Sequence, residues 1–301
     1  MRYILVFVLS LFVITSAARA ETVKVATFNV YWLFNDQPPH KKWWDDVRGS
    51  TGQTYNQALD GVADVIKTID ADVIALQEVE DASVVSDLQT TLQGRGVDYP
   101  HSWISKGADS YTGQDVALLS KFPSSGPPVR EYPNERETYM KEIDAGNEGD
   151  TGLSKVLRVD LNISGKTLPV FVLHLKSQIG GFEADQKRLA QASIIRRLTL
   201  PLIEAGEKFV VMGDLNADRG SPTLRRIRGL DDVFADLSQP AHSDRFEGDK
   251  WTYRYAGRGQ QIDHILLSPT LRKSLQSGQV IYGHGEDVSD HSPLLVTVEL
   301  N

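Results

Sequence analysis

The sequence predicts a domain of mixed α and β structure, and three observations indicate this class. Short runs of β-branched and apolar residues recur along the chain and have the length of buried strands. Between them lie longer stretches with apolar residues at helical spacing. Two of the runs are joined by the sequence NISGKT, which contains the glycine of a hairpin-type turn. At least part of the sheet is therefore antiparallel, and two sheets are expected.

The expected elements follow in chain order. Strands are predicted at 23–28, 73–76, 116–119, 156–161, 168–173, 209–212, 262–267 and 294–298. One helix is predicted at 56–69, where Leu59, Val62 and Ile66 share a face, and another at 183–200. The stretch 123–152 is rich in Pro, Gly and charge, but similar strands flank it on both sides. We interpret it as a surface excursion within one domain.

The first 20 residues have the features of a secretory signal peptide. Arg2 is followed by an apolar run at 3–14 and then by small residues that end in Ala18, Arg19 and Ala20. The run is shorter than the roughly 20 residues needed to cross a bilayer, which argues against a membrane anchor. We therefore expect cleavage after Ala20, a periplasmic or secreted location, and a mature domain at 21–301 without an integral membrane segment.

The composition limits the chemistry that the chain can use. It contains no cysteine, which excludes disulfides, thiolate metal sites and a cysteine nucleophile. Any metal must be held by oxygen and imidazole. The formal net charge is −8, and removal of Arg2 and Arg19 lowers it by two. This charge disfavours broad electrostatic capture of nucleic acid, but carboxylates gathered around a cation would also produce it. A nuclease is therefore not excluded.

Polar residues lie at the ends of most predicted strands. They are Asn29, Glu78, His174, Asp214 with Asn216, Asp263, and the pair Asp290 and His291. Each could be structural by itself, because Asn and Asp commonly make turns and a single His is often a structural hydrogen-bonding residue. Strand ends of a layered sheet, however, converge on one rim where ligands bind. Six such positions in one chain therefore indicate a shared site.

Seven segments, in this order, carry a resemblance to a known family: VATFNVYWLF, VIALQEVED, GQDVALLSKFP, FVLHLKS, VVMGDLNAD, QIDHILLS and VSDHSPLLVTVEL. They resemble the endonuclease/exonuclease/phosphatase superfamily, which includes pancreatic-type deoxyribonucleases, apurinic endonucleases, neutral sphingomyelinases and inositol polyphosphate phosphatases. The segments cover nearly the whole mature chain, and GDLN together with SDHSP is a highly specific pair. The resemblance implies a divalent-metal-dependent phosphoester hydrolase. It also implies a four-layer α/β/β/α sandwich, in which two mixed sheets pack face to face with helices outside.

The resemblance implies a metal site and a general base. Glu78 would be the principal metal carboxylate, with Asn29 beside it, and oxygen ligands of this kind suit Mg²⁺, Mn²⁺ or Ca²⁺. Asp290 and His291 would form a dyad in which the carboxylate orients the imidazole and the other ring nitrogen takes a proton from water.

Four more residues receive roles from the same resemblance. Asp214 would position the attacking water, and Asn216 would donate a hydrogen bond to a phosphate oxygen. His174 would stabilise the pentacovalent phosphorus. Asp263 would hold His174 or the water shell of the metal, although it could also be a structural acceptor. Together these roles describe in-line attack of water on phosphorus without a covalent enzyme intermediate.

Residues next to these positions could also line the cleft. Gln114, Asp115, Lys176 and Arg188 are candidates, although a surface position is an equal alternative for the last two. His264 is expected to have a supporting role.

Two further segments bear on the substrate. Segment 32–44 carries Trp32, Trp43 and Trp44 with two lysines, and it could stack on bases, seat in a lipid interface or cover the edge of the core. Segment 252–259, TYRYAGRG, resembles a stretch of bacterial family members and could equally be a hairpin. Neither segment settles the substrate.

We expect an exported nuclease that acts on DNA or RNA, and we expect it to be a monomer. The alternative enzyme is a phosphodiesterase or phosphatase for phospholipid head groups or small phosphoesters, because the catalytic residues of the two are nearly shared. A catalytically inactive binding protein that keeps only the fold is disfavoured, because the expected base and metal carboxylate are both present.

Overall fold

The computed structural model describes residues 20–107, 112–143, 146–229, 246–255 and 258–300. The expected signal peptide at 1–20 therefore lies almost entirely outside the described residues and stays a prediction. Among the helices within the described ranges, none is long and apolar enough to cross a membrane.

The larger sheet has seven strands in the order β10-β14-β15-β1-β2-β4-β3. Its strands are β1 (Glu21–Leu33), β2 (Val73–Val79), β3 (His101–Ser105), β4 (Asp115–Ser120), β10 (Phe246–Glu247), β14 (Leu275–Val280) and β15 (Leu294–Leu300). β1 pairs parallel with β2 and antiparallel with β15, so the first and last strands of the domain lie side by side. The sheet is mixed, as expected.

The smaller sheet has four strands in the order β13-β9-β8-β7. They are β7 (Val156–Ile163), β8 (Lys166–His174), β9 (Val210–Asp214) and β13 (Asp263–Leu267). The expected hairpin joins β7 to β8 through Ser164 and Gly165, both with positive φ, which is the backbone that a two-residue hairpin turn requires. β8 and β9 pair parallel, so this sheet is mixed as well.

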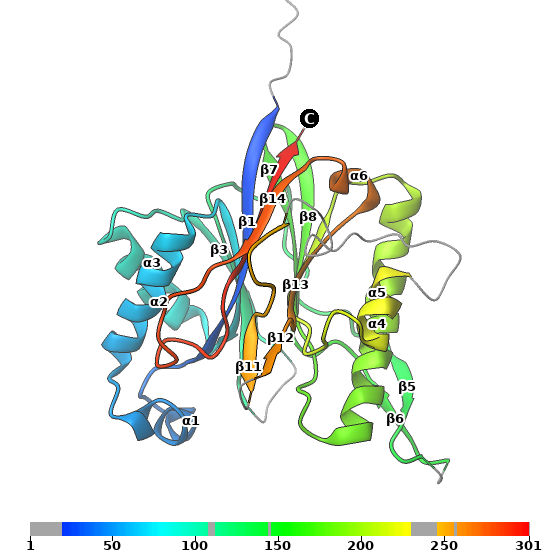
Figure 1. Cartoon of the computed structure of the whole chain (residues 1–301), viewed down its shortest axis with the longest axis horizontal. Coiled ribbons are helices and arrows are strands. Elements are labelled where there is room, and N and C mark those ends of the chain that lie inside the picture. Colours follow the sequence, from blue (N-terminus) through cyan, green and yellow to red (C-terminus); the bar gives the residue numbers. More distant parts are fainter. Residues whose placement is uncertain (1–19, 108–111, 144–145, 230–245, 256–257, 301) are drawn as a thin grey trace, which may run out of the picture.

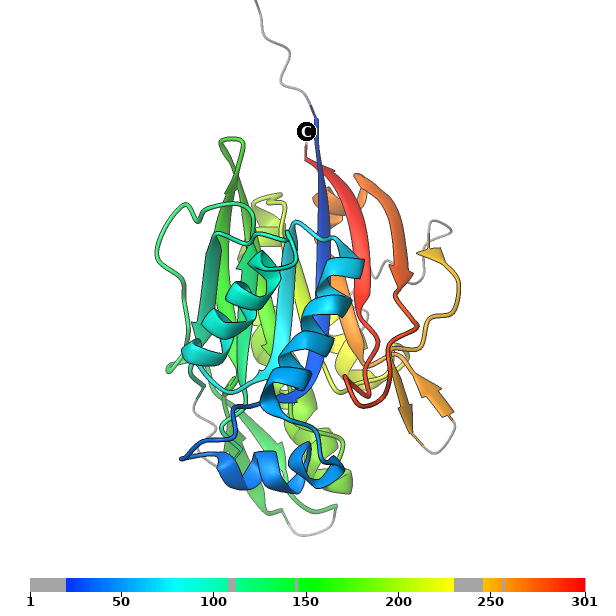
Figure 2. The same ribbon diagram turned by 90° about the vertical axis from the view of Figure 1, so that its left-hand side faces the viewer.

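Helices cover the outer faces of the two sheets. They include α2 (Tyr55–Ile69), α3 (Ala82–Gln93), α4 (Gly181–Glu204) and α5 (Pro222–Arg228). In Figure 1, α2 and α3 lie on one side of the strands and α4 and α5 on the other, and Figure 2 shows α2 and α3 in front of the larger sheet. The predicted four-layer α/β/β/α arrangement is confirmed.

Three groups of buried apolar side chains hold the layers together. The group between the sheets includes Val25, Val172 and Met212. A second group lies between the larger sheet and α2 and α3, and a third lies between the smaller sheet and α4 and α5. Apolar side chains alternate along the strands to both faces because both faces of each sheet are covered.

Capping residues place the two ends of α2 close to those of the helix predicted at 56–69. Thr54 accepts a hydrogen bond from the backbone N–H of Gln57, while the Gln57 side chain accepts one from the backbone of Thr54, which is a capping box. Asp70 ends the helix in the left-handed conformation.

The remaining elements are short, and sequence reasoning found few of them. They are α1 (Lys41–Asp46), η1 (Gly49–Thr51), β5 (Glu137–Met140), β6 (Glu148–Thr151), β11 (Tyr253–Tyr255), β12 (Arg258–Gln260) and α6 (Pro269–Arg272). The expected surface excursion contains β5 and β6. Arg197 of α4 donates hydrogen bonds to the Glu135 carboxylate and to the carbonyl oxygen of Arg136, just before β5. β11 and β12 pair antiparallel, so the hairpin interpretation of segment 252–259 is confirmed.

Candidate active site

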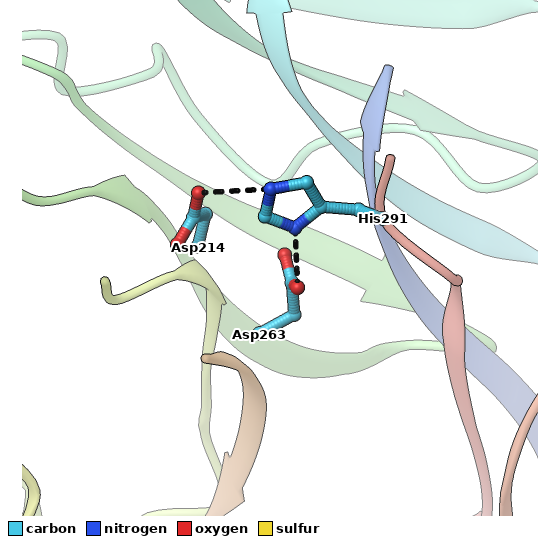
Figure 3. Close-up of side chains that lie close together, drawn as sticks. All are labelled: Asp214, Asp263 and His291. Carbon is cyan, nitrogen blue, oxygen red and sulfur yellow. Dashed lines mark hydrogen bonds and ion pairs between the residues drawn. The ribbon is translucent and has the colours of Figure 1, made fainter. Parts of the chain in front are cut away.

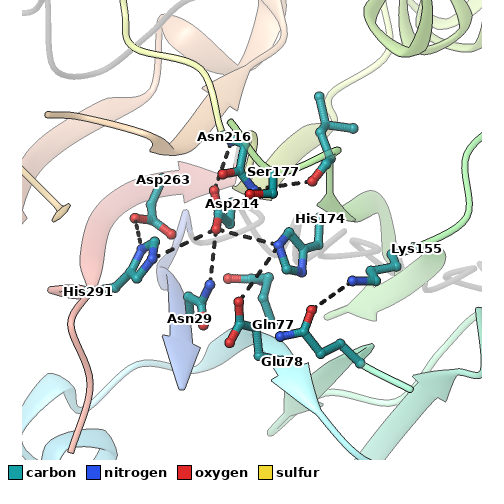
Figure 4. Close-up of polar contacts among 12 residues, drawn as sticks. Asn29, Gln77, Glu78, Lys155, His174, Ser177, Asp214, Asn216, Asp263 and His291 are labelled. Carbon is teal, nitrogen blue, oxygen red and sulfur yellow. Dashed lines mark hydrogen bonds and ion pairs between the residues drawn. The ribbon is translucent and has the colours of Figure 1, made fainter. Parts of the chain in front are cut away.

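The polar strand ends of both sheets meet at one place (Figure 4). Asn29 and Glu78 come from the larger sheet, and His174 and Asp214 come from the smaller one. Asn29 Nδ2 donates to Asp214 Oδ2 at 3.0 Å and joins the two sheets. His174 Nε2 lies 3.6 Å from the same oxygen and 4.0 Å from Glu78 Oε1. The packing of the sheets therefore gathers four groups that are far apart in the sequence.

The site borders a cleft with a volume of about 950 Å³. Its lining includes Glu78, His174, Asp214, Asn216, Asp290 and His291. Asn29 and Asp263 are almost completely buried and support the lining through hydrogen bonds to it. The structure therefore brings all eight predicted site residues together.

A bulge between β1 and β2 aims Glu78 into the cleft. The register of the two strands shifts after Asn29 and resumes at Leu33, and Glu78 has a φ of 64°. Its Oε2 accepts a hydrogen bond at 3.0 Å from the backbone N–H of Trp32, which also has positive φ. Bulges re-aim side chains in this way, and left-handed backbone at non-glycine residues is frequent at functional sites.

His291 pairs with Asp263, and this corrects the expected dyad. His291 Nδ1 lies 2.7 Å from Asp263 Oδ2, within hydrogen-bond distance (Figure 3). Asp290 Oδ1 is 3.9 Å from Nε2. The expectation that Asp290 orients the imidazole is therefore wrong. Asp263, which was expected to hold His174 or the water shell of the metal, supplies the carboxylate that pairs with His291. The physical reason is the packing of the sheets: the first residue of β13 is brought to the segment that precedes β15. Adjacency in the sequence does not decide the partner.

The backbone around His291 is fixed by a serine. The Ser289 hydroxyl donates to the carbonyl oxygen of Asn29 at 2.7 Å and accepts from the backbone N–H of His291 at 3.0 Å. The segment that carries His291 is thereby attached to β1 at Asn29. The second imidazole nitrogen, Nε2, lies 3.9 Å from Asp214 Oδ2.

The GDLN sequence forms the end of β9 and the turn that follows it. Gly213 has a φ of 140°, and a Cβ there would lie 1.9 Å from the carbonyl oxygen of Leu173 on the neighbouring strand. Only glycine fits this close approach. Asp214 Oδ1 accepts from the backbone N–H of Asn216 at 2.8 Å, and the Asn216 amide donates to the carbonyl oxygen of Leu175 at 3.2 Å. The turn therefore presents a carboxylate and a carboxamide side by side.

The site concentrates negative charge. Burial, followed by the neighbouring Asp263, raises the pKa of Asp214 to about 7. Burial and Asp290 also raise the pKa of Glu78. Burial disfavours a charged His291, but the carboxylates of Asp263, Asp214 and Asp290 outweigh it and raise the pKa of the imidazole to about 10. These shifts are the ones expected for carboxylates crowded into a site that favours a cation.

The additional candidates divide into two groups. Gln114 and Lys176 line the cleft, as expected. Asp115 instead accepts from the backbone N–H of Gly107, and Arg188 donates to two backbone carbonyl oxygens beneath the loop that follows β8. These two residues lie behind the cleft and hold its walls.

Lys155 and Tyr253 are among the lining residues that sequence reasoning missed. Lys155 is largely buried and donates to Gln114 Oε1 at 2.9 Å. The ring of Tyr253 lies with its centroid 4.9 Å from that of His291. The only sequence signal for Lys155 was its position directly before an apolar strand. The only signal for Tyr253 was the possible hairpin at 252–259.

The aromatic segment serves both the core and the cleft. Phe34 and Trp44 are buried against α2, as the core interpretation predicted. Trp32 and Trp43 are partly exposed, line the cleft and pack together with ring centroids 5.1 Å apart. His264 is fully buried, and its Nε2 lies 2.8 Å from the carbonyl oxygen of Ala217, in keeping with a supporting role.

Comparison with known proteins assigns the family. The model of the endonuclease/exonuclease/phosphatase family matches residues 26–291, so this chain belongs to that family. Membership supports a hydrolase of phosphoesters and confirms the resemblance that the sequence motifs indicated. No curated protein matches the chain.

Solved structures share the fold at low sequence identity. A family protein from Bacteroides thetaiotaomicron is 16% identical with a TM-score of 0.63, over 94% of this chain and 99% of that one. A beta toxin mutant from Staphylococcus aureus, with bound magnesium ions, is 15% identical with a TM-score of 0.64, over 92% and 99%. A mannosyl-6-phosphatase from Bacteroides thetaiotaomicron is 17% identical with a TM-score of 0.61, over 93% and 100%. At these identities the likeness concerns the fold.

Proposed function

We propose that this protein is an exported, divalent-metal-dependent phosphodiesterase that cleaves nucleic acid by in-line attack of water. The observation that carries the proposal is the pairing of His291 with Asp263 at a cleft that Asp214 also lines. Asp263 fixes the imidazole through Nδ1, which leaves Nε2 on the side of Asp214. A water molecule between Nε2 and Asp214 would be positioned by the carboxylate and deprotonated by the imidazole.

The residues of the cleft fit a hard divalent cation. Glu78 is partly buried and has a raised pKa, and Asp290 Oδ1 is buried without a hydrogen-bond partner among the described residues. Carboxylate and carboxamide oxygens suit Mg²⁺, Mn²⁺ or Ca²⁺, so Glu78 and Asn29 would hold the ion. When bound, it would neutralise charge on the phosphoryl oxygens. Its charge would also offset the carboxylates that raise the pKa of His291, which favours a neutral base.

Donors on the other side of the cleft can stabilise the transition state. His174 and Asn216 both line the cleft, and they project from the ends of β8 and β9. An imidazole and a carboxamide amide can donate hydrogen bonds to the oxygens of a phosphate whose charge grows during attack. This division places proton removal at His291 and charge stabilisation at His174 and Asn216.

The lining of the cleft supports nucleic acid as the substrate. Trp32 and Trp43 offer aromatic faces on which bases can stack. Lys155, Lys176 and Lys187 also line it and can neutralise neighbouring phosphates. This combination suits a polymeric phosphodiester, because lysines at the cleft can offset the repulsion between phosphates and an acidic protein.

The experiment is an assay of the purified protein on plasmid DNA, RNA, sphingomyelin and inositol phosphates with Mg²⁺ or Mn²⁺. We expect cleavage of nucleic acid that stops on addition of EDTA, and a loss of about 10² to 10⁴-fold in His291→Ala. Activity that survives chelation contradicts the metal site, and hydrolysis of the lipid or inositol substrates alone contradicts the substrate. Export is tested separately by the mass of the secreted protein, which should begin at Glu21.

A further inference from the structure

Arg48 is a charged side chain buried beside the cleft. Its side chain is 1% exposed, and all five of its hydrogen-bond acceptors are neutral oxygens. The acceptors are the carbonyl oxygens of Tyr31 (2.7 Å), Val30 (2.6 Å), Val288 (2.8 Å) and Asp287 (3.0 Å), and the side-chain oxygen of Gln53 (2.9 Å). One guanidinium thus joins two backbone segments, 30–31 and 287–288, that are far apart in the sequence.

Burial of this guanidinium is unfavourable by itself. Burial lowers the pKa of Arg48 to about 10, although the carboxylates of Glu78 and Asp290 partly offset the effect. Desolvation of a cation must be balanced by hydrogen bonds of good geometry, and the rigid fork of arginine supplies them. The arrangement therefore depends on all the acceptors being held in place at once.

The first segment that Arg48 holds has strained backbone. Tyr31 and Trp32 are consecutive non-glycine residues with φ of 51° and 49°. This left-handed conformation is unfavourable for residues that carry a Cβ. Arg48 binds the carbonyl oxygens before and at Tyr31, while Glu78 accepts from the backbone N–H of Trp32. The bulge that aims Glu78 into the cleft is thus held from both sides.

The second segment carries the base. Asp287 and Val288, whose carbonyl oxygens bind Arg48, directly precede Ser289, Asp290 and His291. On the other side, Val30 follows Asn29 directly. Arg48 therefore contacts the backbone next to both halves of the site, the half that would hold the ion and the half that supplies the base.

We propose that Arg48 is a positioning residue that sets the distance between the Asn29 and Glu78 side of the cleft and His291. The inference rests on the proposed function for its kinetic consequence. Displacement of a catalytic group by about 1 Å can cost about 10²-fold in rate. The loss would fall on kcat, because Arg48 lies behind the cleft and does not line it.

The test compares Arg48→Met and Arg48→Lys with matched changes at Arg95. Arg95 makes four hydrogen bonds to α2 and α3, to Asp60, Asp64 and Thr91, and it does not line the cleft. Each variant is measured for kcat and KM and for hydrogen exchange, peptide by peptide, in the absence of metal. Arg48→Lys keeps the charge but not the fork, so it should recover part of the loss.

For Arg48→Met we expect kcat to fall by about 10²-fold with KM nearly unchanged. Hydrogen exchange should increase in 29–34 and 284–292 and stay unchanged in β7 and β8. Both Arg95 variants should keep the wild-type kcat. Exchange that rises evenly over the whole protein, or a wild-type kcat in Arg48→Met, overturns the proposal.

Two further outcomes are also decisive. If Arg48→Met fails to fold, Arg48→Lys tests the inference instead. A wild-type kcat together with wild-type exchange at 284–292 in Arg48→Lys overturns the inference. If the wild-type protein hydrolyses none of the substrates, the proposed function fails. Local exchange in the Arg48 variants then still supports or overturns the positioning of the two segments.

Discussion

The partner of His291 can be tested by comparing Asp263→Asn with Asp290→Asn. Both changes remove one negative charge and keep the shape of the side chain. Asp263 lies 2.7 Å from Nδ1 and is 1% exposed, whereas Asp290 is 3.9 Å from Nε2. An asparagine at 263 can present its NH₂ group to Nδ1, which favours the tautomer with the proton on Nε2. The imidazole could not then accept a proton from water on the side that faces Asp214.

The expected cost of Asp263→Asn is the general-base contribution, about 10² to 10⁴-fold in kcat/KM. This corresponds to about 3 to 5 kcal/mol of transition-state stabilisation at 1.36 kcal/mol per factor of ten. Asp290→Asn should cost markedly less, because its carboxylate makes no hydrogen bond to the imidazole.

The assay is steady-state hydrolysis of a generic phosphodiester with saturating Mg²⁺, with thermal unfolding as the control for folding. Asp263 raises the pKa of His291, so its removal lowers that pKa. In Asp263→Asn, His291 should therefore stay neutral down to a lower pH. The acidic limb of the rate profile of any residual activity should then move to lower pH. Equal losses in the two variants, or a larger loss in Asp290→Asn, would refute the pairing.

Three further predictions follow from the site and its support. Glu78→Gln should weaken Mn²⁺ binding by about 10²-fold or more in calorimetry, since it removes the principal charged ligand, and an unchanged Kd would remove Glu78 from the metal site. Gly213→Ala should lower the free energy of unfolding in urea by about 2 to 4 kcal/mol, because its Cβ would meet the Leu173 carbonyl oxygen at 1.9 Å; a smaller loss would mean that the strands move apart easily. Burial lowers the pKa of His264 from 6.5 to about 4, so the folded protein resists protonation of this imidazole. The free energy of unfolding therefore has its full value above pH 6.5 and decreases by about 3 kcal/mol as the pH falls toward 4. His264→Gln should lack this part of the acid destabilisation, and parallel stability curves for variant and wild type would contradict it.

The sequence predicted the main strands well because both sheets are covered on both faces. Each buried strand must then be a short run of apolar residues, and such runs are visible without a structure. It missed the helices α1, α3, α5 and α6 and the strands β3, β5, β6, β10 and β14. β3 and β14 carry polar and partly exposed residues along their length, so they do not form apolar runs. In α3 the segment carries four polar Ser and Thr residues, so its helical pattern is weak, and two-to-four-residue strands have too few positions for a periodicity.

The candidate site was predicted in its members but not in its internal contacts. Asn29, Glu78, Asp214 and His291 were found because each puts a polar group where a strand ends. The imidazole's partner was assigned to the adjacent Asp290, and the structure gives Asp263 instead. Lys155 and Tyr253 had no pattern of their own, and Arg48 reads in the sequence as an ordinary surface arginine.

The sequence by itself determined the mixed class of the fold, the family and the set of polar groups, because strand patterns and motifs are local properties. Only the tertiary structure decided which of these groups touch. The reason is that the two sheets carry separate parts of the site, and their distance and register come from the apolar core between them. A contact such as Asn29 with Asp214, or Arg48 with Val288, is fixed by that packing over segments that the chain order keeps far apart.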